Sequence, residues 1–314
     1  MPHIVISEFM DAPAVERLAK KFSVRYEPTL VDNPQDLAKA LADADGLIVR
    51  NRTQVNAALL ANAPKVRVVG RLGVGLDNID LVACKAGNIQ VIPATGANAR
   101  AVAEYVMGAA LMLARGAFTA TAPVAAGKWP RLAFSNGLEI ENRTMGLVGF
   151  GFIGRLVADL ARPFGMSIAA FDPALPENDP AFAAHGATRH ATLESLLAAA
   201  DVVSLHVPLT PQTRNLINAE KLALMKPTAV LINTARGGVV DEAAVVRALT
   251  ANQLRGAALD VFDSEPLGAG VFPQDTASLP GLLLTPHIAG LTQEANERVS
   301  SLIAERVEQF FESA

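Results

Sequence analysis

The sequence predicts an α/β protein with two domains, each built on a parallel sheet. The chain has 314 residues, 51% of them hydrophobic, which is enough for two sizeable cores. Short β-like runs alternate with helix-like segments along most of the chain, as in parallel sheets covered by helices. A glycine-rich loop at 149–154 resembles the start of a domain but lies mid-chain. A separate folding unit is therefore expected before it.

The first hundred residues predict the first sheet. The β-like runs are 3–9, 22–26, 46–50, 66–72 and 89–92, with helix-like segments at 12–21, 34–44, 55–62 and 79–86. Residues 99–120 predict a long apolar helix that carries the chain into the second domain. Residues 293–311 have apolar side chains at helical spacing, and we expect this helix to return and close the first domain.

Residues 144–172 have the spacing of a dinucleotide-binding βαβ unit. Gly149, Gly151 and Gly154 form G-x-G-x-x-G between an apolar strand-like run and a helix-like segment. In such units the first glycine makes the turn, the second admits the pyrophosphate, and the third packs the helix on the strand. Asp172 ends the next strand-like run and is expected to bind the ribose hydroxyls, which favours NAD over NADP. The alternative is an ordinary glycine-rich turn.

Three later strand-like runs are followed by polar side chains suited to acid–base chemistry. These are Arg236, Glu265 and His287. A guanidinium can bind a carboxylate in bidentate fashion, and histidine has the ordinary pKa nearest neutrality. Together they suit hydride transfer on a 2-hydroxy acid. Separately they could be a surface ion-pair partner, a loop acid and a buried structural histidine; His206 is a second candidate base.

Composition excludes several other classes of function. The net charge is −4, with acids and bases mixed along the chain, so no basic stripe predicts nucleic-acid binding. The single cysteine, Cys84, suits a reducing compartment. The N-terminal residues have no basic region of a signal peptide, and no apolar run approaches a membrane span. We expect a cytoplasmic oxidoreductase, and no histidine–carboxylate spacing predicts a metal site.

The motifs resemble, in order, those of the NAD-dependent D-2-hydroxyacid dehydrogenase family. They are the glycine loop, 206–210 (HVPLT), 233–238 (NTARGG), 259–262 (LDVF), 285–288 (TPHI), 70–80 and 101–104. The resemblance covers nearly the whole chain. It implies a Rossmann nucleotide-binding domain, residues 99–290, inserted in a split flavodoxin-like substrate domain, residues 1–98 and 291–314. It also implies a homodimer formed largely through the NAD-binding domains.

The resemblance also implies roles for individual residues. Arg236, Glu265 and His287 correspond by position to the family's catalytic residues, and Gly73 and Val74 to a loop that binds the substrate carboxylate. The positions implied to contact the cofactor are Gly149, Gly151, Phe152, Ile153, Gly154, Asp172, His206, Pro208, Thr213, Thr234, Ala235, Asp260 and Gly290. The sequence departs from many members at Ala289, where they have glycine.

Positive charge beyond the strand ends of the first domain suggests a second anionic group on the substrate. Arg50 and Arg52 lie at and beyond the end of the run 46–50, and Arg71 lies near the end of the run 66–72. Trp129 and Arg131 lie on a loop that could reach the site of a dimer partner. Arg52 and Arg131 could instead be solvated surface residues. The runs 5–11, 49–55 and 127–131 look similar to the sulfolactate dehydrogenase branch of the family. We therefore expect oxidation of 3-sulfolactate to 3-sulfopyruvate. The resemblance implies the S enantiomer, which the residues themselves do not determine.

Other functions stay open at this point. D-3-phosphoglycerate or another 2-hydroxy acid could be the substrate, and the enzyme could act as a 2-oxo acid reductase. A non-catalytic NAD(H) sensor or corepressor is the alternative of another class, although it would not need all three candidate catalytic residues. A formate dehydrogenase is disfavoured, because its substrate has no second anion for Arg50 and Arg52.

Overall fold

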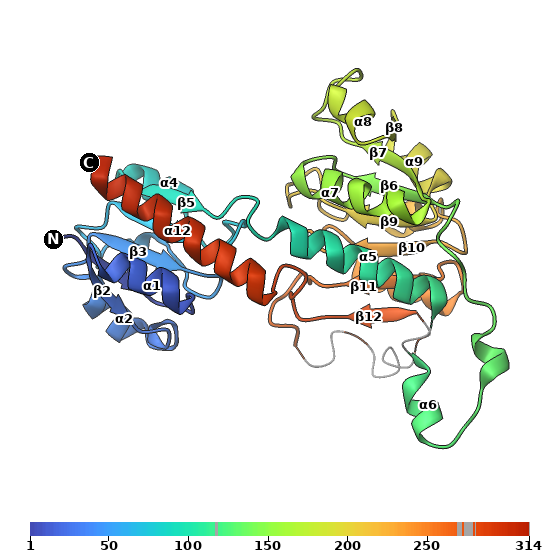
Figure 1. Ribbon diagram of the computed structural model, residues 1–314, viewed down its shortest axis with the longest axis horizontal. Helices are drawn as coiled ribbons and strands as arrows, with labels where there is room; N and C mark the ends of the chain where they lie inside the picture. The colour runs from blue at the N-terminus through green and yellow to red at the C-terminus, as the bar shows by residue number, and fades with distance from the viewer. Residues whose placement is uncertain (117–118, 269–271, 273–278, 280, 314) are drawn as a thin grey trace. The chain divides into compact units, whose positions relative to one another are not determined.

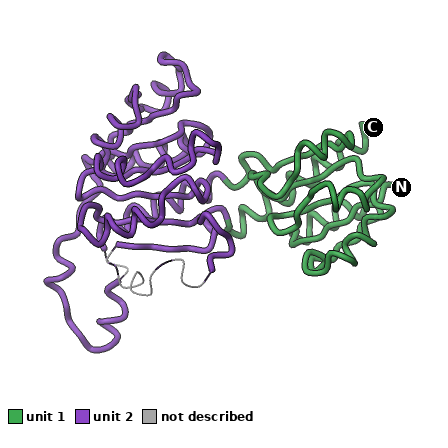
Figure 2. Tube along the Cα trace, turned by 180° about the vertical axis from the view of Figure 1, so that it is seen from behind, with its two compact units in different colours: residues 1–98, 291–314 green, residues 99–290 purple. Residues whose placement is uncertain are grey.

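The computed structural model describes residues 1–116, 119–268, 272, 279 and 281–313. Two compact units are present: Met1–Asn98 together with Leu291–Ala314, and Ala99–Gly290. Figure 2 shows each unit in its own colour. Each contains one sheet, and all the strand pairs among the described residues are parallel. The expected α/β class is confirmed.

Unit 1, Met1–Asn98 with Leu291–Ala314, is built on a five-stranded sheet with the order β2-β1-β3-β4-β5. This is the flavodoxin-like order, in which ligands bind beyond the carboxyl ends of the strands. Its strands are β1 (His3–Ile6), β2 (Ser23–Tyr26), β3 (Gly46–Val49), β4 (Val68–Arg71) and β5 (Gln90–Pro93). Between them lie α1 (Ala12–Ala19), η1 (Leu30–Asp32), α2 (Pro34–Leu41), α3 (Ala57–Leu60) and α4 (Leu81–Ala86).

The C-terminal helix α12 (Gln293–Ser313) packs on this first sheet. Its buried residues Val299, Ile303 and Val307 share a core with the strand residues of β1 and β4. A Cβ on Gly70 in β4 would lie 2.8 Å from Ile303 Cγ2. The absence of a side chain at Gly70 therefore lets the helix approach the sheet, and α12 completes the unit that the N-terminal residues begin.

Unit 2, Ala99–Gly290, is built on a seven-stranded sheet with the order β12-β11-β10-β9-β6-β7-β8. The strands are β6 (Thr144–Val148), β7 (Ser167–Phe171), β8 (Ala187–Arg189), β9 (Val202–Leu205), β10 (Val230–Asn233), β11 (Gly256–Leu259) and β12 (Leu282–Leu284). Chain order reverses between the neighbours β6 and β9. This is the dinucleotide-binding arrangement, in which the ligand binds at the point of reversal.

Helices cover both faces of this second sheet. They are α5 (Ala99–Arg115), α7 (Phe152–Ala161), η4 (Arg162–Phe164), α8 (Pro180–Ala184), α9 (Leu193–Ala199), α10 (Ala219–Leu222) and α11 (Glu242–Thr250). Residues of α5 and α7 belong to one core cluster, and residues of α9, α10 and α11 belong to the other. Figure 1 shows α5 and α7 in front of the sheet. Two short helices, α6 (Thr121–Ala125) and η3 (Arg131–Phe134), belong to a segment that extends away from the sheet (Figure 1).

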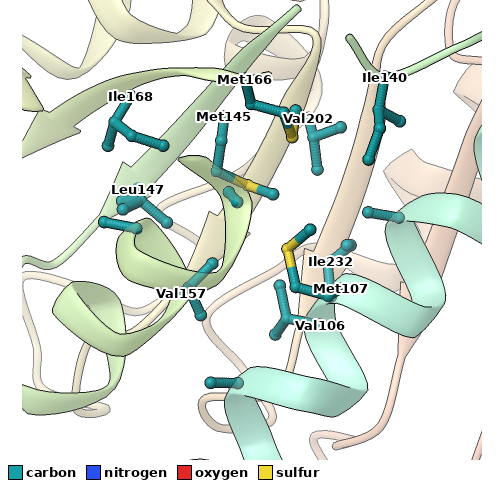
Figure 3. Packing of buried hydrophobic residues seen from close by; sticks show 14 of the residues in the cluster. Val106, Met107, Ile140, Met145, Leu147, Val157, Met166, Ile168, Val202 and Ile232 are labelled. Carbon is teal, nitrogen blue, oxygen red and sulfur yellow. The ribbon is translucent and has the colours of Figure 1, made fainter. Parts of the chain in front are cut away.

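The core of unit 2 fixes the position of the glycine loop. Val106 and Met107 of α5 and Val157 of α7 pack against Met145 and Leu147 of β6 (Figure 3). The strand before the loop and the helix after it are thus both held in one apolar cluster, so the loop between them is fixed at both ends.

Helix α5 is shorter than the sequence predicts. It was expected over 99–120 but ends at Arg115, because Gly116 takes a left-handed conformation with φ +64°. A glycine in this conformation is a common helix terminator. No helix in the described part of the chain is long and apolar enough to cross a membrane.

Candidate functional site

The glycine loop between β6 and α7 excludes side chains at two positions and leaves space at the third. A Cβ on Gly149 would lie 2.4 Å from the carbonyl oxygen of His206, and one on Gly154 would lie 2.4 Å from that of Gly149. Nothing lies within 4 Å of the Cβ position of Gly151, the N-cap residue of α7. Because helix N-terminal N–H groups attract phosphates, the loop fits the pyrophosphate of NAD.

Asp172 lies where the sequence places the ribose contact, directly after β7. Its Oδ2 accepts the backbone N–H of Phe150 at 2.8 Å, and its Oδ1 accepts that of Ala174 at 2.9 Å. The carboxylate thus ties the end of β7 to the glycine loop. A carboxylate has about four lone-pair positions, so Asp172 keeps acceptor capacity for ribose hydroxyls.

Residues after β9 form the next part of the expected cofactor site. Thr213 Oγ1 donates to the carbonyl oxygen of Pro208 at 2.6 Å and accepts the N–H of Thr210 at 2.7 Å, which closes this loop on itself. Burial lowers the pKa of His206 to about 4. At neutral pH this imidazole is therefore uncharged and a weak base, which argues against His206 as the general base.

His287 and Glu265 are brought together by the structure. His287 Nδ1 lies 2.6 Å from Glu265 Oε2, and Glu265 Oε1 accepts the N–H of Phe262 at 2.9 Å. The side chains of His287 and Glu265 are 46% and 33% exposed, so a ligand can reach them. Because Glu265 engages Nδ1, it orients the ring and leaves Nε2 as the nitrogen that can exchange a proton with a substrate.

Asp260 holds the turn that carries His287. His287 has an unusual φ of +55°, and its N–H donates to the Asp260 carbonyl oxygen at 2.8 Å. The Asp260 carboxylate, 1% exposed, accepts the Thr285 hydroxyl at 2.6 Å and the N–H groups of Ile288 and Ala289 at 2.8 Å each. Sequence reasoning proposed Asp260 only as a cofactor contact and missed this scaffolding.

Arg236 follows β10, the strand next to β11. The buried Asn233 ends β10; its Oδ1 accepts the N–H of Ala235 at 3.1 Å and its Nδ2 donates to the carbonyl oxygen of Arg236 at 3.0 Å. These bonds shape the turn from which Arg236 projects. Since β10, β11 and β12 are neighbours in one parallel sheet, Arg236, Glu265 and His287 all lie beyond the same edge.

The segments that carry Arg236 and Glu265 touch backbone to backbone. A Cβ on Gly237 would lie 1.8 Å from the carbonyl oxygen of Phe262 and 2.6 Å from the nitrogen of Asp263. Glu242, at the start of α11, accepts the N–H of Asp263 at 2.8 Å. The spacing of these two segments therefore depends on a glycine at 237. Gly237 lies within the motif 233–238, but the motif alone does not show this contact with Phe262.

In unit 1, the expected substrate residues Arg50 and Arg52 have different surroundings. Arg50 is half-buried, its Nη2 donates to Asn296 Oδ1 at 2.7 Å, and its guanidinium lies 5.8 Å from the centre of the Phe9 ring. Burial lowers the pKa of Arg50. Arg52 is 60% exposed and pairs with Asp32. Arg50 is thus part of a packed site, whereas Arg52 lies on the surface.

The loop with Gly73 and Val74 follows β4, the neighbour of β3. A Cβ on Gly73 would lie 1.8 Å from Arg71 Nη1, so the guanidinium rests against this glycine. The Gly73 N–H donates to the Arg71 carbonyl oxygen at 2.7 Å. To bind a substrate carboxylate, this N–H would have to give up that hydrogen bond. Val74 is 38% exposed, so the loop is open to solvent.

Comparison with known proteins identifies the family. The model for the D-isomer specific 2-hydroxyacid dehydrogenase, NAD binding domain, matches residues 107–289. The chain belongs to the D-isomer specific 2-hydroxyacid dehydrogenases. As a member, it is an NAD-dependent 2-hydroxyacid dehydrogenase, and the sequence-based predictions of the family, the cofactor and enzymatic activity are confirmed.

Relatives of this dehydrogenase act on several 2-hydroxy acids. It is 50% identical to an (S)-sulfolactate dehydrogenase of Chromohalobacter salexigens, over 98% of this chain and 97% of that protein. It is 37% identical to a D-3-phosphoglycerate dehydrogenase of Methanocaldococcus jannaschii, over 98% of this chain but 57% of that protein. A D-lactate dehydrogenase from Aquifex aeolicus, solved with NAD and lactic acid, has TM-score 0.84 and 28% identity, covering 99% and 96% of the two chains.

Gly237→Ala should disrupt this dehydrogenase's active site while its overall fold persists. A methyl group would meet the Phe262 carbonyl oxygen at 1.8 Å, so the Arg236 and Glu265 segments must separate. We expect kcat to fall at least about 100-fold, as for displaced catalytic groups. The measurement is steady-state NADH formation beside circular dichroism. The control is Gly108→Ala in α5, where nothing lies within 4 Å; equal kcat in the two variants would contradict the account.

His206 should make the stability of the apo-dehydrogenase pH-dependent. Its folded-state pKa of about 4 lies below its ordinary 6.5, so below pH 6.5 the unfolded chain binds more protons. The contribution of the neutral, buried His206 to the free energy of unfolding is therefore present above pH 6.5 and is lost as the pH falls towards about 4. The Tm of His206→Gln should therefore fall less over this pH interval than the Tm of the wild type. His190→Gln is the control, at a histidine whose Nδ1 lies 3.0 Å from Ser195 Oγ. Parallel curves for wild type and His206→Gln would refute the assignment.

Proposed function

We propose that this enzyme oxidises a dianionic 2-hydroxy acid with NAD, and that 3-sulfolactate is its substrate and 3-sulfopyruvate its product. The contact between His287 Nδ1 and Glu265 Oε2 at 2.6 Å is the observation that carries the reaction type. It supplies an oriented, accessible acid–base group beyond the carboxyl edge of a dinucleotide-binding sheet. The 50% identity to a protein named (S)-sulfolactate dehydrogenase supports the choice of substrate.

In this proposal Arg236 and His287 act on the substrate, and Glu265 acts on His287. The Arg236 guanidinium binds the substrate carboxylate and polarises the 2-oxygen. His287 Nε2 accepts the hydroxyl proton as the hydride leaves C2, and returns it in the reverse reaction. Glu265 stabilises the charge that then develops on the imidazole. NAD supplies the hydride acceptor when bound, and Gly151, Asp172 and the other expected cofactor residues hold it.

In unit 1, the Arg50–Arg52 loop is proposed to bind the second anion of the substrate, and Gly73 and Val74 are proposed as further substrate-binding residues. A guanidinium that is already partly desolvated, as Arg50 is, interacts more strongly with an anion than one in bulk water. D-3-phosphoglycerate also carries a second anionic group, and the 37% identity to a phosphoglycerate dehydrogenase keeps it as the second candidate. A sensor without catalysis would have no use for the oriented His287–Glu265 pair.

We also propose that the enzyme is a cytoplasmic homodimer formed through unit 2. The segment with α6 and η3 extends from the sheet (Figure 1) and carries exposed apolar side chains: Trp129 is 81% and Leu132 is 87% exposed. Apolar surface of this kind typically marks an interaction site. The buried, unpaired Cys84 supports a reducing compartment.

The KM of the enzyme should depend on the number of anionic groups that the substrate carries. NADH formation across 3-sulfolactate, 3-phosphoglycerate, malate, glycerate and lactate should show the lowest KM for 3-sulfolactate. Arg52→Ala should raise the KM for 3-sulfolactate several-fold and leave that for lactate almost unchanged, because a lost ground-state contact appears in KM. Arg25→Ala, at another exposed and ion-paired arginine of unit 1, is the matched control. Equal changes for both substrates would exclude a second-anion contact at Arg52.

A further inference from the structure

Glu8 is a buried carboxylate that the proposed chemistry does not use. It lies two residues after β1 and is 4% exposed. Burying an isolated carboxylate is costly unless hydrogen bonds compensate the loss of water. A buried charge at the carboxyl end of a strand, where this fold binds its ligands, therefore calls for a specific explanation.

Both oxygens of Glu8 accept backbone N–H groups of one loop. Oε1 accepts the N–H of Arg50 at 2.8 Å and that of Thr53 at 3.0 Å, and Oε2 accepts the N–H of Arg52 at 3.1 Å. Backbone N–H groups that converge in this way form a concavity suited to an anion. Here the protein's own carboxylate fills it, so these N–H groups face inward and are committed to Glu8.

The same loop is held through its carbonyl groups by Asn78. Asn78 is 7% exposed, and its Nδ2 donates to the carbonyl oxygens of Arg50 at 3.2 Å and Thr53 at 2.8 Å. In addition, Ser7 Oγ lies 3.0 Å from Thr53 Oγ1, and both hydroxyls are buried. Glu8 and Asn78 therefore fix the backbone of the loop from outside it, and Ser7 holds the Thr53 side chain. The two arginine side chains point away from these contacts to Asn296 and Asp32, which an anionic ligand would have to displace or share.

We propose that Glu8 is a positioning residue for substrate specificity: it holds the Arg50–Thr53 loop so that its arginines meet the second anionic group of the substrate. The inference rests on the proposed function, because it needs that group to bind at this loop. A carboxylate is needed at position 8 for a geometric reason. The two oxygens of Glu8 accept all three N–H groups, whereas a neutral amide offers only one oxygen.

Positioning and simple electrostatics predict opposite effects of the same substitution. Glu8→Gln removes a negative charge near Arg50, which by Coulomb's law alone would strengthen anion binding and lower KM. If Glu8 instead positions the loop, losing its charge-assisted hydrogen bonds should raise the KM for 3-sulfolactate about tenfold, the equivalent of roughly one such bond. The KM for lactate, kcat and the Kd for NADH should change far less.

Glu27→Gln is the matched control, because Glu27 follows β2 in the same sheet and its side chain is 45% exposed. A lower or unchanged KM for 3-sulfolactate in Glu8→Gln would overturn the inference. An equal loss with lactate would also overturn it, since that marks general damage. If Glu8→Gln does not fold, the KM values for 3-sulfolactate and lactate are measured instead in Asn78→Ser, which releases the loop's carbonyl groups. The same criteria then apply. If wild-type enzyme itself shows no preference for 3-sulfolactate over lactate, the proposed function fails and the inference fails with it.

Discussion

The proposed catalytic site of unit 2 depends on one buried carboxylate, that of Asp260. A carboxylate that is 1% exposed must have its lone pairs satisfied, and Asp260 achieves this by accepting the Thr285 hydroxyl and the N–H groups of Ile288 and Ala289. These bonds impose the turn in which His287 takes its left-handed conformation. Without the turn, the imidazole would lose its place beside Glu265, and acid–base chemistry requires that alignment.

Other acidic side chains hold neighbouring loops in the same way in both units. Asp172 accepts an N–H group of the glycine loop, Glu242 accepts one from the segment that leads to Glu265, and Glu8 accepts three from the Arg50–Thr53 loop. In each case an acid fixes a neighbouring loop through its main chain, so that the conformation of the loop does not depend on its own side chains. Loops that carry function are thus made rigid by the scaffold, as precise catalytic geometry requires.

Sequence patterns predicted what depends on local spacing and missed what depends on contacts across the sheet. The glycine loop and the polar residues after β10, β11 and β12 were visible because strand, turn and helix signals flank them. The scaffolding by Asp260 and the close contact at Gly237 were not visible, because both depend on which strands are neighbours. The end of α5 at Arg115 was also missed, since an apolar pattern continued past Gly116. The roles of individual residues stay predictions.

Transfer of deuterium from C2 of the substrate to the cofactor would show hydride transfer and its dependence on His287. Enzyme with NAD would be given 3-sulfolactate deuterated at C2, and the reduced cofactor analysed by mass spectrometry. We expect deuterated NADH in a single turnover, and loss of most of this transfer in His287→Ala with cofactor binding retained, because general acid–base help is typically worth about 10²–10⁴-fold. NADH without deuterium, or undiminished transfer in His287→Ala, would contradict hydride transfer assisted by the His287–Glu265 pair.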